Sequence, residues 1–549
     1  MTALDCLPYG VGHSDADEGI CLLMRMGPYR ILLDCGLWDI RPLKGNGDSP
    51  AIDLVLCSHA HADHARGLRS LHRAFPELPI YASEVTAALL PLNWLDDGKL
   101  LPTERFCQPL PWREPLEVKE GLWVELFPAG HLPGASIARL TYASGNSTYT
   151  VVYTGDFLLS NSRLVEGLPL EELRGLAPDV LIAEGSYGTA RYPRRRTQEN
   201  QLAERIYRAI CDRQSVLLPV PTLGLGQELL MLLRSHHHFT GRDLDIWVNG
   251  SVAIGCDTYL KLLPHFPSTV QNFARHQALF WDERVCPRVR RLTPQQRAAV
   301  GKSPCIILTD ETTDVSQFCR PDSGHWLVLL QEHPGYPLRN EELAFRYEHS
   351  VGTSQLQVET YLLGEHCDGS GTTQLIHNLR PHHVIFVHGT PAYLADLTNL
   401  EELRNRYKLH YPATGKLVEL PIGEQFLQPE MPEASYEGEL TEEDSGVTIA
   451  FPKTMTSDPR WQNFADTGLV EARWQGDELV MRCVSQRELL DRTGERPIPP
   501  ELECCANCVH YRGQRCWNQS SPLYGFKVTP DGYCPVFEAI DKTKRDRDK

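Results

Sequence analysis

The chain has 549 residues and a formal net charge of −17, and 42% of its residues are hydrophobic. A chain of this length is expected to form roughly two to four domains with ample apolar core. No run approaches the roughly 18 apolar residues that span a membrane, and no basic-then-apolar leader opens the chain, so we expect a cytoplasmic protein. Twelve of the 17 cysteines are scattered before residue 500, which indicates thiols in a reducing compartment rather than disulfides.

In the first 190 residues, four β-rich runs are each followed by polar side chains that could bind a metal. After three of these runs, a glycine or proline lies close to the polar residue. These residues are Asp34, the dense group His59, His61, Asp63 and His64, then His131 and Asp156. Imidazole nitrogen and carboxylate oxygen are ligands that zinc prefers. A lone aspartate after a strand is usually a turn residue or a helix cap. Because strand ends deliver side chains into a common cleft, four such places in order favour a site for two metal ions instead.

The rest of the chain changes character several times. Helical stretches at 198–211 and 226–234 alternate with apolar runs at 216–220, 244–248 and 326–330, which predicts an α/β insertion with parallel strands. Residues 430–444 hold seven acidic residues and no basic one, as in a solvated linker. The predicted divisions are a first domain at 1–190, the insertion at 191–360, a return to the first domain at 361–427, an acidic linker at 428–445, a small β-rich module at 446–500, a cysteine-rich module at 501–540 and a disordered tail at 541–549.

The cysteine-rich module predicts a further metal centre. Cys505, Cys508, Cys516 and Cys534 offer four thiolates that open with a C-x-x-C pair, and Cys504 is a substitute ligand. The lack of a second C-x-x-C argues against an ordinary zinc ribbon. The spacing is similar to that of high-potential iron–sulfur proteins, so both Zn²⁺ and a [4Fe–4S] cluster stay open.

Ordered motifs within about residues 10 to 425 resemble those of a known family. The strand-end residues named above are similar to the four motifs of the metallo-β-lactamase superfamily. Glu184, His366 and His388 lie in segments that resemble the motifs of its β-CASP nucleases. The pattern is similar to that of RNase J and of the nuclease subunit of the cleavage and polyadenylation specificity factor. This resemblance implies an α/β protein: a metallo-β-lactamase αββα sandwich with an inserted α/β β-CASP domain.

The resemblance also implies roles for these residues at two catalytic zinc ions. One ion would be held by His59, His61, His131 and Asp156, and the other by Asp63, His64, Asp156 and His388. Asp63 and Asp156 would thereby serve the catalytic step as well. His366 would protonate the leaving ribose oxygen, with Glu184 orienting its ring. Asp34 would hold a ligand histidine or its loop from behind.

By the same resemblance, the activity is that of a zinc-dependent ribonuclease that leaves 5′-phosphates in RNA processing or decay. Family members that act on RNA carry a histidine at the third β-CASP motif, as this chain does at His388. The expected partner is RNA, in a homodimer or an RNA-processing complex and without a membrane. Candidate RNA contacts are Arg191, Arg194, Arg195 and Arg196.

Three alternatives stay open at this point. The first is a single-stranded DNA nuclease of the same group. The second is a small-molecule hydrolase of the parent superfamily, which would leave Glu184, His366 and His388 unexplained. The third is a non-catalytic processing subunit, in which the fold is kept and the ligands are lost, whereas all ligands are present here.

Overall fold

A computed structural model describes most of the chain in two compact units, Met1–Pro429 and Glu430–Lys549. The described residues are 4–12, 19–44, 51–96, 99–100, 106–145, 147–297, 300–320, 323–334, 341, 344–345, 356–422, 439–443, 446–450, 470–475, 478–483, 505–512, 515–518 and 538–539. Each unit is treated by itself below. The domain limits proposed from the sequence stay predictions.

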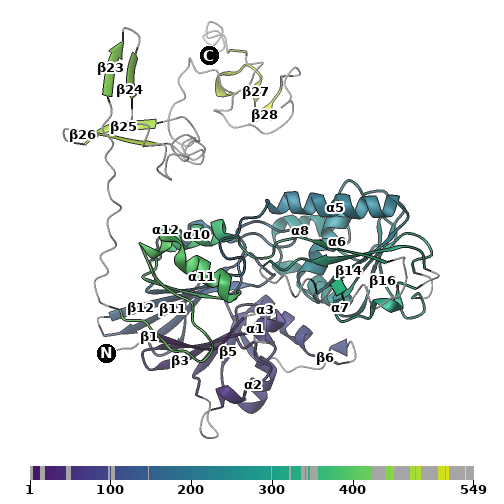
Figure 1. Ribbon diagram of the computed structural model, residues 1–549, viewed down its shortest axis with the longest axis horizontal. Coiled ribbons are helices and arrows are strands. Elements are labelled where there is room, and N and C mark those ends of the chain that lie inside the picture. The colour runs from purple at the N-terminus through teal and green to yellow at the C-terminus, as the bar shows by residue number, and fades with distance from the viewer. Residues whose placement is uncertain are drawn as a thin grey trace, which may run out of the picture. The chain divides into compact units, whose positions relative to one another are not determined.

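Two seven-stranded mixed sheets form the frame of the first unit (Figure 1). One sheet has the order β22 (Val418–Glu419), β1 (Leu4–Val11), β2 (Ile20–Met26), β3 (Tyr29–Leu33), β4 (Leu54–Leu56), β5 (Ile80–Ser83) and β8 (Cys107–Leu110). The other has the order β21 (Lys408–His410), β20 (His383–Val387), β13 (Val180–Glu184), β12 (Ser147–Tyr153), β11 (Ser136–Ser144), β10 (Leu122–Pro128) and β9 (Leu116–Lys119).

The alternation of apolar side chains explains how these sheets are layered. Along β3, Ile31 and Leu33 join one apolar cluster together with Ile182 of β13, so they fill the space between the sheets. Leu32 and Leu181 belong to a second cluster that also contains helical leucines. Both faces of these strands are therefore buried, as expected for a sandwich with helices outside.

Helices cover the outer face of each sheet (Figure 1). The first sheet is covered by α1 (Ala62–Ala65), α2 (Leu68–Ala74) and α3 (Glu84–Leu89). The second is covered by α10 (Gly369–Leu379), α11 (Pro391–Asn399) and α12 (Glu401–Arg404). Shorter elements are η1 (Arg41–Leu43), η2 (Leu90–Asn93), η3 (Leu263–His265), η4 (Val315–Gln317), α4 (Leu170–Leu173), β6 (Leu95–Asp96) and β7 (Lys99–Leu100).

A six-stranded parallel sheet is inserted between β13 and β20. Its strands have the order β16 (Arg288–Arg291), β15 (Asp245–Val248), β17 (Ile306–Asp310), β14 (Ser215–Val220), β18 (Trp326–Gln331) and β19 (Leu356–Tyr361). Its helices are α5 (Arg195–Cys211), α6 (Leu225–Ser235), α7 (Gly250–Lys261) and α8 (Ser268–His276). The expected α/β insertion with parallel strands is confirmed, and the helix expected at 198–211 begins at Arg195.

In the second unit the structure describes three hairpins and one short helix. These are β23 (Glu439–Glu443) with β24 (Gly446–Ala450), β25 (Val470–Gln475) with β26 (Glu478–Cys483), β27 (Tyr511–Arg512) with β28 (Arg515–Cys516), and η7 (Cys505–Asn507). Strand β23 lies within the segment expected to be an acidic linker. The end of that segment is therefore paired in a hairpin, with Leu440 opposite Ile449. Cys505, Cys508 and Cys516 are buried, whereas Cys504, Cys534 and the tail 541–549 lie outside the described residues.

Among the parts of the chain that the structure describes, no helix has the length and apolar character that crossing a bilayer requires.

Candidate metal centre

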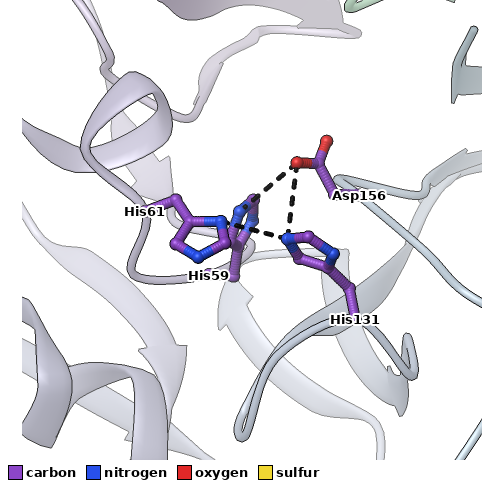
Figure 2. Close-up of side chains that lie close together, drawn as sticks. All are labelled: His59, His61, His131 and Asp156. Carbon is purple, nitrogen blue, oxygen red and sulfur yellow. Dashed lines mark hydrogen bonds and ion pairs between the residues drawn. The ribbon is translucent and has the colours of Figure 1, made fainter. Parts of the chain in front are cut away.

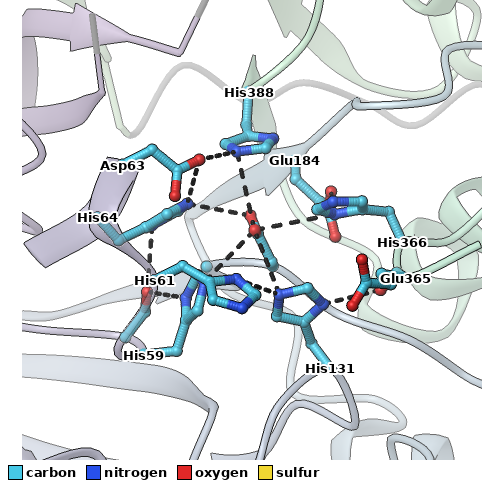
Figure 3. Close-up of polar contacts among 12 residues, drawn as sticks. His59, His61, Asp63, His64, His131, Glu184, Glu365, His366 and His388 are labelled. Atoms are coloured by element: carbon cyan, nitrogen blue, oxygen red, sulfur yellow. Dashed lines mark hydrogen bonds and ion pairs between the residues drawn. The ribbon is translucent and has the colours of Figure 1, made fainter. Parts of the chain in front are cut away.

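The strand ends of the two sheets meet at one edge and bring the predicted polar residues together (Figure 3). His59 to His64 follow β4, His131 follows β10, and Asp156 follows β12. Glu184 is the last residue of β13, and His388 directly follows β20. Strands β10 and β12 are both antiparallel to β11, so their carboxyl ends share an edge. The expectation that separate strands deliver these side chains to one place is confirmed.

One cluster is formed by His59, His61, His131 and Asp156 (Figure 2). One ligand atom from each of the four lies within 4.8 Å of the others. Asp156 Oδ2 is 3.5 Å from His59 Nε2 and 3.7 Å from His131 Nε2. His131 Nε2 is in turn 3.0 Å from His61 Nδ1. Three imidazoles thus face one carboxylate in a largely enclosed space.

A neighbouring cluster contains Asp63, His64 and His388 and shares Asp156 with the first. Asp156 Oδ1 is 3.3 Å from His64 Nε2, and Asp156 Oδ2 is 3.7 Å from His388 Nε2. His388 Nε2 also lies 3.2 Å from Asp63 Oδ2. The Asp156 carboxylate therefore stands between the clusters, in the position of a group that bridges two cations. Such a His/Asp arrangement is typical of a binuclear metal site.

The donor atoms of these residues fit bound cations. His59 Nε2, His64 Nε2 and Asp156 Oδ1 are buried and have no hydrogen-bond partner among the described residues. A buried polar atom without a partner costs about 1–3 kcal/mol, which coordination would offset. Neutral imidazoles are the form that binds metal, and burial holds the pKa of both His59 and His131 well below the usual range.

Each of four imidazoles is held from outside through Nδ1, which leaves Nε2 directed to the centre. The outer contacts are Ser58 Oγ to His59 at 3.0 Å, Asp34 Oδ2 to His64 at 2.6 Å, the Glu365 carbonyl to His131 at 2.8 Å and Ser186 Oγ to His388 at 2.8 Å. Such contacts set the tautomer and the ring orientation of a metal ligand. His61 is turned the other way, with Nδ1 toward His131.

Asp34 lies behind His64 and is fully buried. Its Oδ2 accepts hydrogen bonds from Ser58 Oγ at 2.7 Å and from the Tyr153 hydroxyl at 2.5 Å, besides the contact with His64. Asp34 has a φ of 57°, and His388 has a φ of 55°, a left-handed backbone that is uncommon for residues other than glycine. The rest of the site holds both residues in this strained conformation.

His366 and Glu184 form an ion pair (Figure 3), and Asp156 lies next to it. His366 Nδ1 is 2.7 Å from Glu184 Oε2 and 3.8 Å from Asp156 Oδ2. Glu184 Oε1 accepts a hydrogen bond from the Phe157 amide at 2.6 Å, and its Oε2 accepts one from Ser186 Oγ. Burial lowers the pKa of His366, but the negative charges of Glu184 and Asp156 outweigh it and raise that pKa to about 10.

The loop that carries His366 is held by residues of the inserted region, on α5 and at the end of β18. Arg195 donates a hydrogen bond to the Gly364 carbonyl at 2.5 Å, and the Gly364 amide donates one to Gln198 Oε1 at 2.7 Å. Gln331 Nε2 donates to Glu365 Oε2 at 2.8 Å. The two domains of the first unit therefore meet at this loop.

The four predicted RNA-contacting arginines differ in their surroundings. Arg191, Arg194 and Arg196 are exposed. The side chain of Arg195 is only 9% exposed and lies 3.6 Å from both Glu199 and Glu228. Its guanidinium group is therefore engaged inside the protein.

Several residues that support this centre were missed by reasoning from the sequence. They are Ser58, Tyr153, Ser186, Gln198 and Gln331, all with contacts described above. Their sequence positions carry no sign of a role, because each acts through a partner that is distant in the chain or through a local backbone turn.

Comparisons with known proteins agree with this geometry. A beta-lactamase superfamily domain is matched by residues 29–210. The uncharacterized protein sll0514 of Synechocystis sp. is 49% identical over 545 residues, which are 97% of this chain and 96% of that protein. Integrator complex subunit 11 of Danio rerio is 23% identical, over 76% of this chain and 74% of that protein. Probable RNase MJ4 of Methanocaldococcus jannaschii is 29% identical, over 40% of this chain and 54% of that protein.

The resemblance inferred from the sequence motifs is therefore confirmed. Residues from separate strand ends meet at a paired His/Asp centre, a parallel sheet is inserted between β13 and β20, and the match to Integrator complex subunit 11 extends over 76% of the chain. The chain belongs to the metallo-β-lactamase superfamily, in the β-CASP group that is related to Integrator complex subunit 11 and to RNase J.

Proposed function

We propose that this protein is a ribonuclease that hydrolyses RNA phosphodiester bonds with two zinc ions and leaves 5′-phosphates. The fold and the His/Asp cluster are those of a metal-dependent hydrolase. RNA as the substrate is supported by distant relatives with the names Probable RNase MJ4 and RNase J-like protein, both of Methanocaldococcus jannaschii. The observation that carries the proposal is the His366–Glu184 pair next to Asp156, because a leaving ribose oxygen needs a proton donor at that place.

In this proposal, His59, His61, His131 and Asp156 hold one zinc ion, and Asp63, His64, Asp156 and His388 hold the other. When bound, the two ions supply a nucleophile at neutral pH and stabilise the charges of an in-line displacement. Asp34, Ser58 and Ser186 keep the imidazoles oriented, so that little reorganisation is needed during the reaction.

His366 serves as the general acid in this scheme. Glu184 holds the proton on His366 Nδ1, so the second proton of the imidazolium is on Nε2 and available to the substrate. Water gives one proton to the solvent and forms a new bond to phosphorus. The bond between phosphorus and O3′ breaks, and O3′ takes the proton from His366, which regains a proton from the solvent. The new 5′ end therefore carries the phosphate, and the upstream fragment ends in a 3′-hydroxyl.

A substrate panel tests this proposal. The zinc-loaded protein is incubated with a 5′-monophosphorylated linear RNA, a circular RNA and a single-stranded DNA of the same sequence. We expect RNA fragments with 5′-phosphates, identified by mass spectrometry, and no products from the Asp156→Asn variant. Equal or faster cleavage of the DNA would favour a DNA nuclease of the same group. Turnover of small esters without any nucleic-acid cleavage would favour a small-molecule hydrolase.

We also propose a third metal centre at Cys505, Cys508, Cys516 and Cys534. The burial of each of the three described thiols supports it, because a metal-bound thiolate is usually shielded from solvent. Quantifying zinc and iron per chain, together with acid-labile sulfide, distinguishes Zn²⁺ from a [4Fe–4S] cluster. We expect one metal equivalent or one cluster beyond the catalytic pair, lost in Cys508→Ser. Only two zinc ions and no iron in the wild type would exclude the centre.

A further inference from the structure

Trp38 and Arg66 form a solvent-exposed pair beside the metal centre. Trp38 is 70% exposed, more than any other large hydrophobic side chain that the structure describes. The Arg66 guanidinium carbon lies 4.6 Å from the centroid of the Trp38 ring, in a cation–π contact. A tryptophan this exposed gains little from burial, so its contribution to folding is small.

The pair is rigidly attached to the loops that carry the metal-ligating residues. The Cys35 amide donates to the His64 carbonyl at 2.8 Å, and the Gly67 amide donates to the Cys35 carbonyl at 2.9 Å. A side chain at Gly36 would clash with the Asp63 carbonyl, since an added Cβ would lie 1.7 Å from that oxygen. The backbone before Trp38 is therefore packed directly against Asp63 and His64.

Arg66 is itself anchored at both ends. Its Nε donates to the Ala62 carbonyl at 3.0 Å, and its own carbonyl accepts a hydrogen bond from Trp94 Nε1 at 3.1 Å. Arg66 is two residues from His64 and three from Asp63, whose side chain is 42% exposed. The Trp38–Arg66 pair is thus tied through short backbone contacts to Asp63 and His64 of the second cluster.

The two segments that carry the pair have an excess of positive charge, in contrast to the chain as a whole. Residues 38–44 and 62–74 contain five cationic side chains, Arg41, Lys44, Arg66, Arg69 and Arg73, against two carboxylates. Asp39 is paired with Arg41 at 2.5 Å, and Asp63 belongs to the metal centre. On a protein with a net charge of −17, this is a place where a polyanion is attracted rather than repelled.

We infer that Trp38 and Arg66 form a stacking platform that binds a base of the single-stranded RNA substrate next to the metal centre. The base stacks on the free face of the Trp38 ring, and the adjacent phosphate lies near the Arg66 guanidinium group. Stacking on an aromatic side chain tolerates every base, because each base has a π face. The platform rests on the proposed function, and it places one nucleotide of the strand on the metallo-β-lactamase side of the centre.

Steady-state kinetics with a single-stranded oligoadenylate RNA test the platform. Trp38→Ala should raise KM by on the order of 10- to 100-fold and leave kcat nearly unchanged, and Trp38→Phe should restore most of the loss. Trp123 on β10 is the matched control, because it is also exposed, at 39%, and lies in the sheet away from the ligand loops. Trp123→Ala should keep the wild-type KM.

Fluorescence gives a readout that does not depend on turnover. In EDTA, oligoadenylate should quench the wild-type tryptophan emission, and the quenching should be smaller in Trp38→Phe. An unchanged KM in Trp38→Ala, with RNA still cleaved by the wild type, overturns the platform and leaves the proposed function standing. Wild-type protein that cleaves no nucleic acid overturns the proposed function. In that case the fluorescence result alone tests the platform: quenching that depends on Trp38 supports it, and equal quenching in Trp38→Phe overturns it.

Discussion

Two groups of closely spaced histidines in this protein have very different surroundings. Six imidazoles meet around Asp156, delivered by the loops after β4, β10, β19 and β20. His236, His237 and His238 follow α6 as consecutive residues, and their donor atoms also lie within 4.8 Å of one another. In this second group neighbouring rings lie against each other, with centroids 4.3 and 4.2 Å apart.

The difference lies in what holds and what faces the rings. At the metal centre, outer contacts occupy Nδ1 of four imidazoles, and a buried carboxylate faces Nε2. In the consecutive triplet, His237 is exposed, His238 pairs with Glu204 at 2.8 Å, and His236 contacts the backbone amide of His238. Histidines that are neighbours in the sequence are therefore a weaker sign of a metal site than histidines from several strands whose rings are held in place by hydrogen bonds to other residues.

The largest expected effect is at the shared carboxylate. Asp156→Asn should lower turnover of RNA by more than about 10³-fold and reduce the bound zinc, because both clusters lose their common charge. His237→Asn should retain wild-type turnover and zinc content. Zinc analysis alongside single-turnover kinetics checks both variants, and the contrast between the two histidine groups fails if His237→Asn loses a catalytic zinc.

The next effect concerns the proton donor. His366→Gln should lower kcat for RNA by about 10²- to 10⁴-fold with full zinc content. A phosphodiester with a p-nitrophenolate leaving group should lose far less, because that group departs without a proton. His377→Gln is the control, since His377 lies on α10 and contacts Tyr407 instead. Equal losses for both substrates would assign His366 to the metal centre rather than to the leaving group.

A smaller effect is expected at the domain contact. Arg195→Gln removes the hydrogen bond to Gly364 and leaves Glu199 and Glu228 without their cation, so we expect kcat to fall roughly 10-fold at unchanged KM. The free energy of unfolding should fall by about 3 kcal/mol, since the pair is buried. Exposed Arg196 serves as the control in Arg196→Gln. A rise in KM alone for Arg195→Gln would indicate an RNA contact instead of a positioning role.

The smallest effect is a pH dependence of the free energy of unfolding, which arises at the pair formed by His383 and His410. His383 Nδ1 lies 3.0 Å from His410 Nε2, and His383 Nε2 lies 3.2 Å from the Pro421 carbonyl. Burial lowers the pKa of His383 from 6.5 to about 4. Because the folded pKa is below the unfolded one, stability is full above about pH 6.5 and is lost as the pH falls toward about 4.

Thermal unfolding of wild type and His383→Gln measures this effect. We expect the wild-type Tm to fall by roughly 2 °C more than that of the variant between about pH 7 and about pH 5. The comparison between the two proteins removes the contribution of the many carboxylates. Parallel curves would show that His383 binds its proton equally well in both states.

The sequence predicted the ligands of the centre better than their support. His59, His61, Asp63 and His64 stand at a spacing that is informative by itself, and the other ligands follow strands in a recognisable order. Ser58 and Tyr153 could not be predicted, because their contacts to Asp34 depend on how distant strands pack. The left-handed backbone at His388 is equally invisible, since local preference opposes it and tertiary contacts impose it.

Some expectations depended on local composition alone, and in these cases contacts with other parts of the chain changed the outcome. The basic run at 191–196 suggested a uniform patch, but the first turn of α5 directs Arg195 inward to Gly364 and leaves its neighbours exposed. The acidic run suggested a linker throughout, but the pairing of Leu440 with Ile449 forms a strand at its end. In both cases a partner outside the run, which composition does not reveal, decides the local structure.

The position of the inserted sheet has a consequence for synthesis of the chain. His59 to Asp156 leave the ribosome early, whereas His388 follows only after the entire insertion, which separates β13 from β20. A nascent chain can therefore assemble the first group of ligands long before the second group is complete. The two-cluster centre can therefore be completed only after the inserted sheet has been synthesised.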